Sequence, residues 1–170
     1  MDKPISTFRG QKELYELLNR LSIAFDYYEH PPAPTIEEAK KYWKDIEATH
    51  CKNLFFRNHK GNQHYLVVFD HCHDLRIHEL ERRLKQGKLS FASEARMEKY
   101  LGVKPGSVSP LALINDTEKH VHVFLDENLQ HATKISFHPN VNTASIVISF
   151  SDFIKFLNFV GNKWEFTNLY

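Results

Sequence analysis

Apolar residues recur along the chain with two periods, and each period predicts one kind of element. Between positions 11 and 21, leucines stand three and four residues apart, which is the spacing of an amphipathic helix. Segments 52–57 and 64–70 are rich in β-branched and aromatic residues and predict strands. The glycine and asparagine at positions 61 and 62 supply a hairpin turn between these two strands.

Further elements are indicated by capping residues and by short apolar runs. Four polar residues precede apolar stripes and are expected to cap helices, namely Thr35 (with Glu38 completing a capping box), Asp74, Ser93 and Ser151. Glycines are expected to end the last three of these helices, at Gly87, Gly102 and Gly161. Apolar runs predict strands at 23–30, 111–114, 121–125, 135–138 and 144–150.

The order of these elements predicts the fold class. Helices and strands are intermixed, but hairpins dominate the middle and the end of the chain. This arrangement favours an α+β fold with a mixed, largely antiparallel sheet over a doubly wound parallel one. The length of 170 residues suits one domain, and no linker divides the chain, so a single domain over residues 1–170 is expected.

Net charge, apolar runs and cysteine content exclude several classes of protein. The net charge is only +1, whereas a protein that wraps a nucleic-acid duplex shows a clear basic excess. We therefore expect no duplex DNA partner, and a nucleic acid would be held only at an end or by one patch. No apolar run is long enough to cross a membrane. Two cysteines do not form a disulfide framework, which favours the cytoplasm.

Lys52 and Asn53 begin an apolar strand and are the first candidate site residues. Strand alternation places Lys52 on the same face as Leu54 and Phe56, where an ammonium group needs a partner. Such a lysine is a fixed cation for a phosphate or a developing negative charge. The simpler alternative is a lysine at the strand edge that extends its ammonium group to water.

Two loops carry the remaining candidates. In Gly102–Pro110, two glycines and two prolines shape the backbone, and the lack of bulk at Gly106 and Ser107 allows a ligand to approach closely. An ordinary turn after a helix is the alternative. Segment 136–143 ends a strand at His138, which Pro139 biases toward extended geometry.

A metal site has little support in the sequence. His71 and His73, like His120 and His122, are spaced so that both imidazoles share a strand face. No third ligand stands at a motif spacing, so we expect no metal, and surface histidines are the better interpretation. Nucleophile-elbow, Walker and dinucleotide-binding motifs are absent as well.

Taken in order, four segments resemble the prolyl-tRNA editing domain family, which comprises YbaK-like domains and free-standing relatives of the prolyl-tRNA synthetase insertion domain. The segments are 28–39 (YEHPPAPTIEEA), 52–57 (KNLFFR), 106–110 (GSVSP) and 137–143 (FHPNVNT). The most specific marks are the strand lysine and the Gly-x-x-x-Pro loop. The resemblance covers nearly the whole chain and implies a barrel-like central sheet with helices packed around it.

The resemblance also implies an activity. It indicates a trans-editing hydrolase that cleaves the ester of mischarged tRNA(Pro), with the alanine-specific subgroup as the best match. The chemistry would be substrate-assisted, with a ribose hydroxyl helping to position water and with no cofactor. Lys52, Gly106 and His138 would be catalytic. The residues that would bind substrate are His30, Thr35, Asn53, Ser107, Val108, Pro110 and Asn140.

Partners and alternatives follow from the same resemblance. The expected partner is the acceptor end of tRNA(Pro), with prolyl-tRNA synthetase as a further candidate. Alternatives are editing of cysteine or serine, or a non-catalytic module that binds tRNA or a synthetase. A metal-dependent hydrolase built on the paired histidines is a more distant alternative. The segment from His71 to Asp74 matches nothing in the family, so no role is assigned to it.

Overall fold

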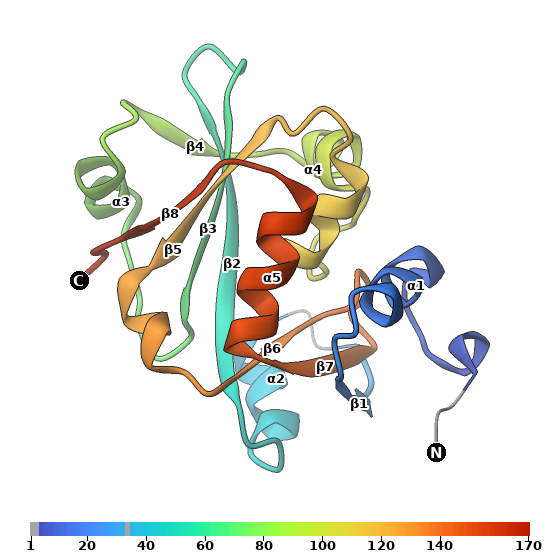
Figure 1. Ribbon diagram of the computed structural model, residues 1–170. Coiled ribbons are helices and arrows are strands. Elements are labelled where there is room, and N and C mark those ends of the chain that lie inside the picture. The colour runs from blue at the N-terminus through green and yellow to red at the C-terminus, as the bar shows by residue number, and fades with distance from the viewer. Residues whose placement is uncertain (1–3, 33–34) are drawn as a thin grey trace.

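One mixed β-sheet runs through the molecule and organises the other elements around it (Figure 1). The computed structural model describes residues 4–32 and 35–170. Within that part of the chain the strands are β1 (Asp26–Glu29), β2 (Thr49–Asn58), β3 (His64–Asp70), β4 (Leu89–Phe91), β5 (Val121–Asp126), β6 (Lys134–Phe137), β7 (Ala144–Ser149) and β8 (Trp164–Thr167).

The sheet has the order β1-β7-β6-β2-β3-β5-β8, and β4 adds to β2. Four pairings are antiparallel, those of β7 with β1 and β6 and those of β2 with β3 and β4. The pairs β2–β6, β3–β5 and β5–β8 are parallel. The predicted α+β fold with a mixed, largely antiparallel sheet is therefore confirmed.

The expectation of a barrel-like sheet is wrong. Closure requires the first and last strands to hydrogen-bond to each other. In the described residues β1 pairs only with β7, and β8 pairs only with β5. Helix α5 (Phe150–Val160) crosses the inner face of the sheet, between β8 and β1 in Figure 1. Its buried side chains Phe153, Phe156, Leu157 and Val160 belong to the main core on that face.

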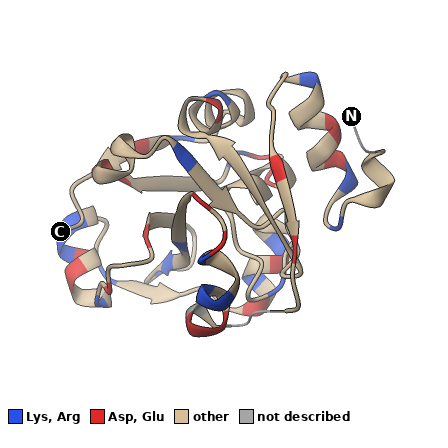
Figure 2. Cartoon of the chain, turned by 90° about the horizontal axis from the view of Figure 1, so that it is seen from below, with Lys and Arg blue, Asp and Glu red and all other residues tan. Residues whose placement is uncertain are grey.

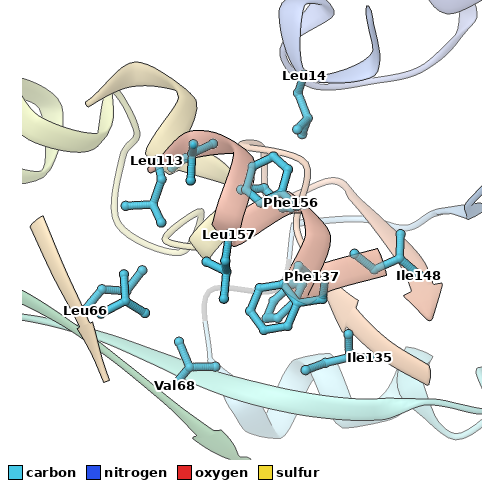
Figure 3. Close-up of a cluster of buried hydrophobic side chains, with 14 of the residues drawn as sticks. Leu14, Leu66, Val68, Leu113, Ile135, Phe137, Ile148, Phe156 and Leu157 are labelled. Carbon is cyan, nitrogen blue, oxygen red and sulfur yellow. The ribbon is translucent and has the colours of Figure 1, made fainter. Parts of the chain in front are cut away.

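Helices cover both faces of the sheet. They are α1 (Lys12–Arg20), α2 (Ile36–Trp43), α3 (Ile77–Leu84), α4 (Glu94–Leu101) and α5, with short 3-10 turns η1 (Ile5–Thr7), η2 (Pro110–Asn115) and η3 (Glu127–His131). The main core joins α1 and α5 to one sheet face, and it includes Leu14, Leu66, Phe137 and Phe156 (Figure 3). A smaller core packs α3 against the opposite face.

Several expected elements form in a different way. Residues 111–114 lie in the 3-10 turn η2, since Pro110 stands at its start and Ser109 caps it by accepting from the Leu111 amide. The strand expected at 23–30 is limited to β1. Strands β4 and β8 were not predicted, because a run of three or four residues is too short for a period to be recognised.

Helix caps are partly as expected. Thr35 and Ser93 accept from backbone amides as N-caps, and Gly102 and Gly161 end their helices with positive φ. Asp74 is not a cap, because α3 begins after Arg76, which makes no side-chain cap. That helix ends at Lys85, in the left-handed conformation, and not at Gly87. The cap of α5 is Ser149, two residues before the expected Ser151.

Charge is spread over the surface. Figure 2 shows Lys and Arg interspersed with Asp and Glu, which agrees with the net charge of +1. Within the described ranges no helix is long and apolar enough to cross a membrane. Ala33 and Pro34, which belong to the first of the four sequence segments, lie outside the described residues.

The corrected cap of α5 is open to a direct test. Replacing Ser149 by alanine removes the oxygen that accepts from the Asp152 amide. We expect this variant to lower the free energy of unfolding by about 1 kcal/mol. Ser151→Ala is the control, since the structure gives that hydroxyl no capping role, and it should cost much less. Urea unfolding measures both, and a larger loss in Ser151→Ala would contradict the assignment.

Candidate active site

A cavity of about 450 Å³ lies against one edge of strand β2. Strand β3 pairs with β2 from Cys51 to Arg57, but the opposite edge is paired only at its ends. There β6 pairs with Thr49 and His50, and β4 begins its pairing at Phe56. The cavity opens in the gap between β6 and β4. Its other walls come from α2, from α4 and from the loop before η2.

The gap exposes backbone groups as well as side chains. The His71 amide donates to His50 O and the Asn58 amide to Gln63 O, so even-numbered residues of β2 bond toward β3. Odd-numbered residues therefore direct their N–H and C=O groups to the other edge. Phe55 O, which accepts from the Ala92 amide on that edge, follows this rule. Asn53 consequently directs its peptide groups toward the cavity.

The side chain of Asn53 also lacks a partner. Its Oδ1 atom is buried and accepts no hydrogen bond within the described part of the chain. A buried acceptor without a donor is costly, and native proteins usually satisfy such an atom with water or a ligand. Asn53 is also one of the residues that line the cavity, so this oxygen without a donor belongs to the cavity wall.

Lys52 is held firmly at the wall of the cavity. Its side chain is 17% exposed, and its ammonium group donates to Asp74 Oδ1 and, over 3.0 Å, to His73 O. The Phe69 ring lies 6.0 Å from the ammonium nitrogen. An ammonium group has three N–H donors, and these contacts use two of them. The sequence-based expectation that this cation needs a partner is confirmed, and no further acceptor for the third donor is found in the described ranges.

Asp74 is a site residue that the sequence analysis missed. The only signal was an acid before an apolar helical stripe, which indicated a cap. In the fold it lines the cavity and pairs with Lys52 across 22 residues of sequence. The hydrogen bond and the charge of Lys52 hold the pKa of the Asp74 carboxyl below its usual value. The charges of Lys52 and Asp74 therefore compensate each other at the cavity wall.

The loop after α4 forms the opposite wall. Gly106 has φ +87°, a conformation that other residues adopt only with strain, and lines the cavity together with Pro105 and Val108. The Ser107 amide donates to Lys104 O over 3.0 Å and closes a turn. That amide is therefore engaged, and the amides of Gly106 and Val108 are left as candidate donors to a ligand.

His138 lies at the cavity with His30 behind it. Because a carbonyl can only accept, His138 Nδ1 donates to Ala144 O over 2.8 Å, and its Nε2 carries the lone pair. Burial lowers the pKa of the His138 imidazole, and the Ala144 bond offsets this in part. The His30 ring lies 5.8 Å from that of His138, and its Nε2 is 2.9 Å from Ser145 Oγ.

The structure brings six of the ten sequence-predicted site residues to the cavity, namely Thr35, Lys52, Asn53, Gly106, Val108 and His138. The other four do not line it. His30 supports His138 from behind, and Ser107 and Pro110 are buried in the loop that carries Gly106. Asn140, with φ +64°, donates to Gln11 Oε1 over 2.9 Å and so fixes a turn.

Other lining residues carried no recognisable sequence signal. They are mainly apolar and include Trp43, Phe69, Leu75, Phe91 and Met97. Each belongs to a different helix, strand or loop, and apolar residues of this kind look like core in a sequence. Their convergence on one cavity depends on the tertiary fold.

The paired histidines do not converge on one centre. His73 stacks on Tyr170, and His120 Nε2 lies 2.8 Å from His64 Nδ1. His122 is paired with Glu165. Among the described residues one group has potential ligand atoms within 4.8 Å of one another, and it consists of Asp70, His71 and Cys72. None of the three lines the cavity, and within the group only Cys72 is exposed.

The neutral state of His138 generates a prediction. We expect its imidazole to titrate below the ordinary pKa of about 6.5 and to carry its proton on Nδ1 at neutral pH. Two-dimensional NMR of ¹⁵N-labelled imidazoles measures both properties. The urea-unfolded protein is the control, because there the residue regains its ordinary pKa. A midpoint at or above 6.5 in the folded state would refute the expectation.

The Lys52–Asp74 pair generates a second prediction. Asp74→Asn leaves the Lys52 charge uncompensated, so pyrophosphate should bind several-fold tighter than to the wild type, and less so at high salt. Glu79→Gln is a matched control, because it removes one exposed acid that pairs with Arg82 and does not line the cavity. Isothermal titration calorimetry compares the three proteins. Equal gains in both variants would mean that only net charge matters.

Comparison with known proteins identifies the class to which this fold and cavity belong. A sequence model of the aminoacyl-tRNA editing domain family matches residues 30–156, from His30 to Phe156. That range contains the strand edge, the glycine loop and His138. The chain therefore belongs to the aminoacyl-tRNA editing domain family.

Individual relatives agree with the resemblance to prolyl-tRNA editing domains. The chain is 41% identical over 150 residues to the prolyl-tRNA editing protein ProX of Acetoanaerobium sticklandii, covering 87% of this chain and 90% of the relative. It is 38% identical over 149 residues to prolyl-tRNA synthetase associated domain-containing protein 1 of Danio rerio, covering 86% and 80% of the two chains.

A solved structure shows the same fold at lower sequence identity. A protein described as a candidate trans-editing enzyme for prolyl-tRNA synthetase superposes with a TM-score of 0.65 at 18% identity. The match covers 99% of both chains. The arrangement of sheet and helices is therefore shared across the whole described chain.

Proposed function

We propose that this protein hydrolyses the ester of mischarged tRNA(Pro), with alanine as the preferred amino acid. The observation that carries the proposal is the cavity at the edge of β2, where Lys52, Asn53, Gly106 and His138 meet. Family membership and the names of the relatives support the same activity. The volume of about 450 Å³ exceeds what an alanyl group needs, which leaves room for the terminal nucleoside.

Asn53 is suited to hold the amino acid. Its buried Oδ1 atom and the backbone C=O on the open edge of β2 are acceptors, and the α-ammonium group of an aminoacyl ester is a donor. These groups would fix the amino acid at one end of the cavity. Val108 and the β2 backbone would then limit the side chain to a small size.

Lys52 and Gly106 are suited to stabilise charge. The third N–H of the Lys52 ammonium can reach a phosphate or the oxygen that becomes negative as water attacks the ester. On the opposite wall the amide of Gly106 is a second candidate donor to that oxygen. Fixed donors of this kind lower the barrier because they are already oriented before the reaction.

The water would be positioned by the substrate itself. Cys51 lines the cavity, but burial raises the pKa of its thiol, so a thiolate nucleophile is disfavoured. His138 is neutral, and its Nε2 lone pair can accept a hydrogen bond. We assign His138 to orienting a ribose hydroxyl of the terminal adenosine, which in turn holds the attacking water.

The proposal is tested by deacylation of alanyl-, cysteinyl-, seryl- and prolyl-tRNA(Pro). We expect alanine release that is unaffected by a chelator and that falls about 10²- to 10³-fold in Lys52→Ala. The pocket can separate alanine from cysteine or serine by only about 1–3 kcal/mol, so the order of the four rates matters. Glu79→Gln is the control with unchanged rate.

Each other outcome supports a different function. Faster release of cysteine or serine would place the protein with editing enzymes for those residues. Stable alanyl-tRNA in the presence of wild-type protein, together with measurable tRNA binding, would indicate a non-catalytic module. Loss of activity with a chelator would instead favour a metal-dependent hydrolase.

A further inference from the structure

Phe91 stands out among the apolar side chains of the surface. Its side chain is 62% exposed, the highest value among the large apolar residues that the structure describes. One side of its ring packs on Phe56, which is fully buried, with the centroids 4.7 Å apart and the planes at 35°. The ring is thus supported from behind and open in front. It lines the same cavity as Lys52.

The strand pairing fixes how far Phe91 lies from Lys52. Strand β4 pairs with β2 so that Phe91 lies opposite Phe56, and Phe56 shares a face with Lys52 four residues away. Four strand residues span about 13 Å. A nucleoside that carries an aminoacyl ester is long enough to place its base at one end of this distance and its ester at the other.

The surroundings of Phe91 suit a flat aromatic ligand. Three partly buried apolar residues, Leu54, Leu75 and Met97, line the same cavity. A nucleobase stacks on an aromatic ring through its π face, and the apolar neighbours remove water from its edges. A phosphate would gain nothing from such a surface, and an alanyl methyl group has much less apolar area to bury than a base.

We propose that Phe91 is the stacking platform for the terminal adenine base of the tRNA acceptor end. The assignment rests on the proposed function, because it gives a place to the nucleoside that carries the ester. Stacking fixes the base, and the ribose then lies between Phe91 and Lys52. Phe91 is therefore a binding residue that sets how the ester enters the cavity, and it takes no part in bond breaking.

The test measures steady-state deacylation of alanyl-tRNA(Pro) by three variants. Phe91→Ala should raise KM about 5- to 100-fold with little change in kcat, as expected for the loss of one stacked base. Phe91→Trp should restore KM to near the wild-type value. Phe91→Leu keeps an apolar side chain on Phe56 but has no π face, so it should behave like the alanine variant.

A matched control comes from the other exposed phenylalanine. Phe159 is 51% exposed and lies outside the cavity, so Phe159→Ala should leave KM unchanged. The second readout is binding of a non-hydrolysable 3′-alanylamido-adenosine and of the same ribose amide without a base. Phe91→Ala should weaken binding of the first compound only.

The outcomes separate this inference from the proposed function. If the wild type releases no alanine and binds no adenosine compound, the proposed function fails. If the wild type is active and Phe91→Ala has a normal KM, only the stacking inference fails. The stacking inference is also overturned if Phe91→Ala lowers kcat alone, or if it weakens binding of both amides equally. A further contrary result would be a dimer of the wild type, seen by sedimentation, that is a monomer in Phe91→Ala.

Discussion

Strand β2 is paired with β3 from Cys51 to Arg57, while its other edge is paired only where β6 and β4 reach it. Everything proposed for this protein depends on that interruption. Peptide groups in the middle of a sheet are normally hydrogen-bonded to another strand or to water. Here the gap is bounded by α2, α4 and the loop before η2, which turn an open strand edge into a cavity. A ligand can therefore use backbone groups, Lys52 and Asn53 from one short segment.

Charge in the cavity is balanced before any substrate arrives. Among the lining residues Lys52 is the cation and Asp74 the acid, and the two are paired. An uncompensated ammonium group beside Phe69 would be costly to keep there. The same pair orients Lys52, because its ammonium is held from two sides and presents its remaining donor. Under the proposed function, a chain of net charge +1 would hold the end of an RNA by local contacts and have little general affinity for duplexes.

The sequence indicated most of the fold and six of the 17 residues that line the cavity. It found β2, β3 and the loop at Gly106, because strand alternation and glycine–proline patterns are local signals. It placed Ser151 two positions away from the true cap and made Asp74 a cap, since several polar residues near a helix start satisfy the same rule. Phe91 escaped attention because a three-residue strand has no period.

The amino-acid sequence alone determined the α+β class and the family, and it indicated candidate site residues, because each depends on patterns a few residues long. Only the tertiary structure decided which of those residues meet. It left the sheet open, since β1 pairs only with β7 and β8 only with β5 among the described residues. It moved His30, Pro110 and Asn140 behind or away from the cavity, and it brought Asp74 and Phe91 to its walls. Contacts between residues distant in sequence depend on how the elements pack, and no local pattern specifies that.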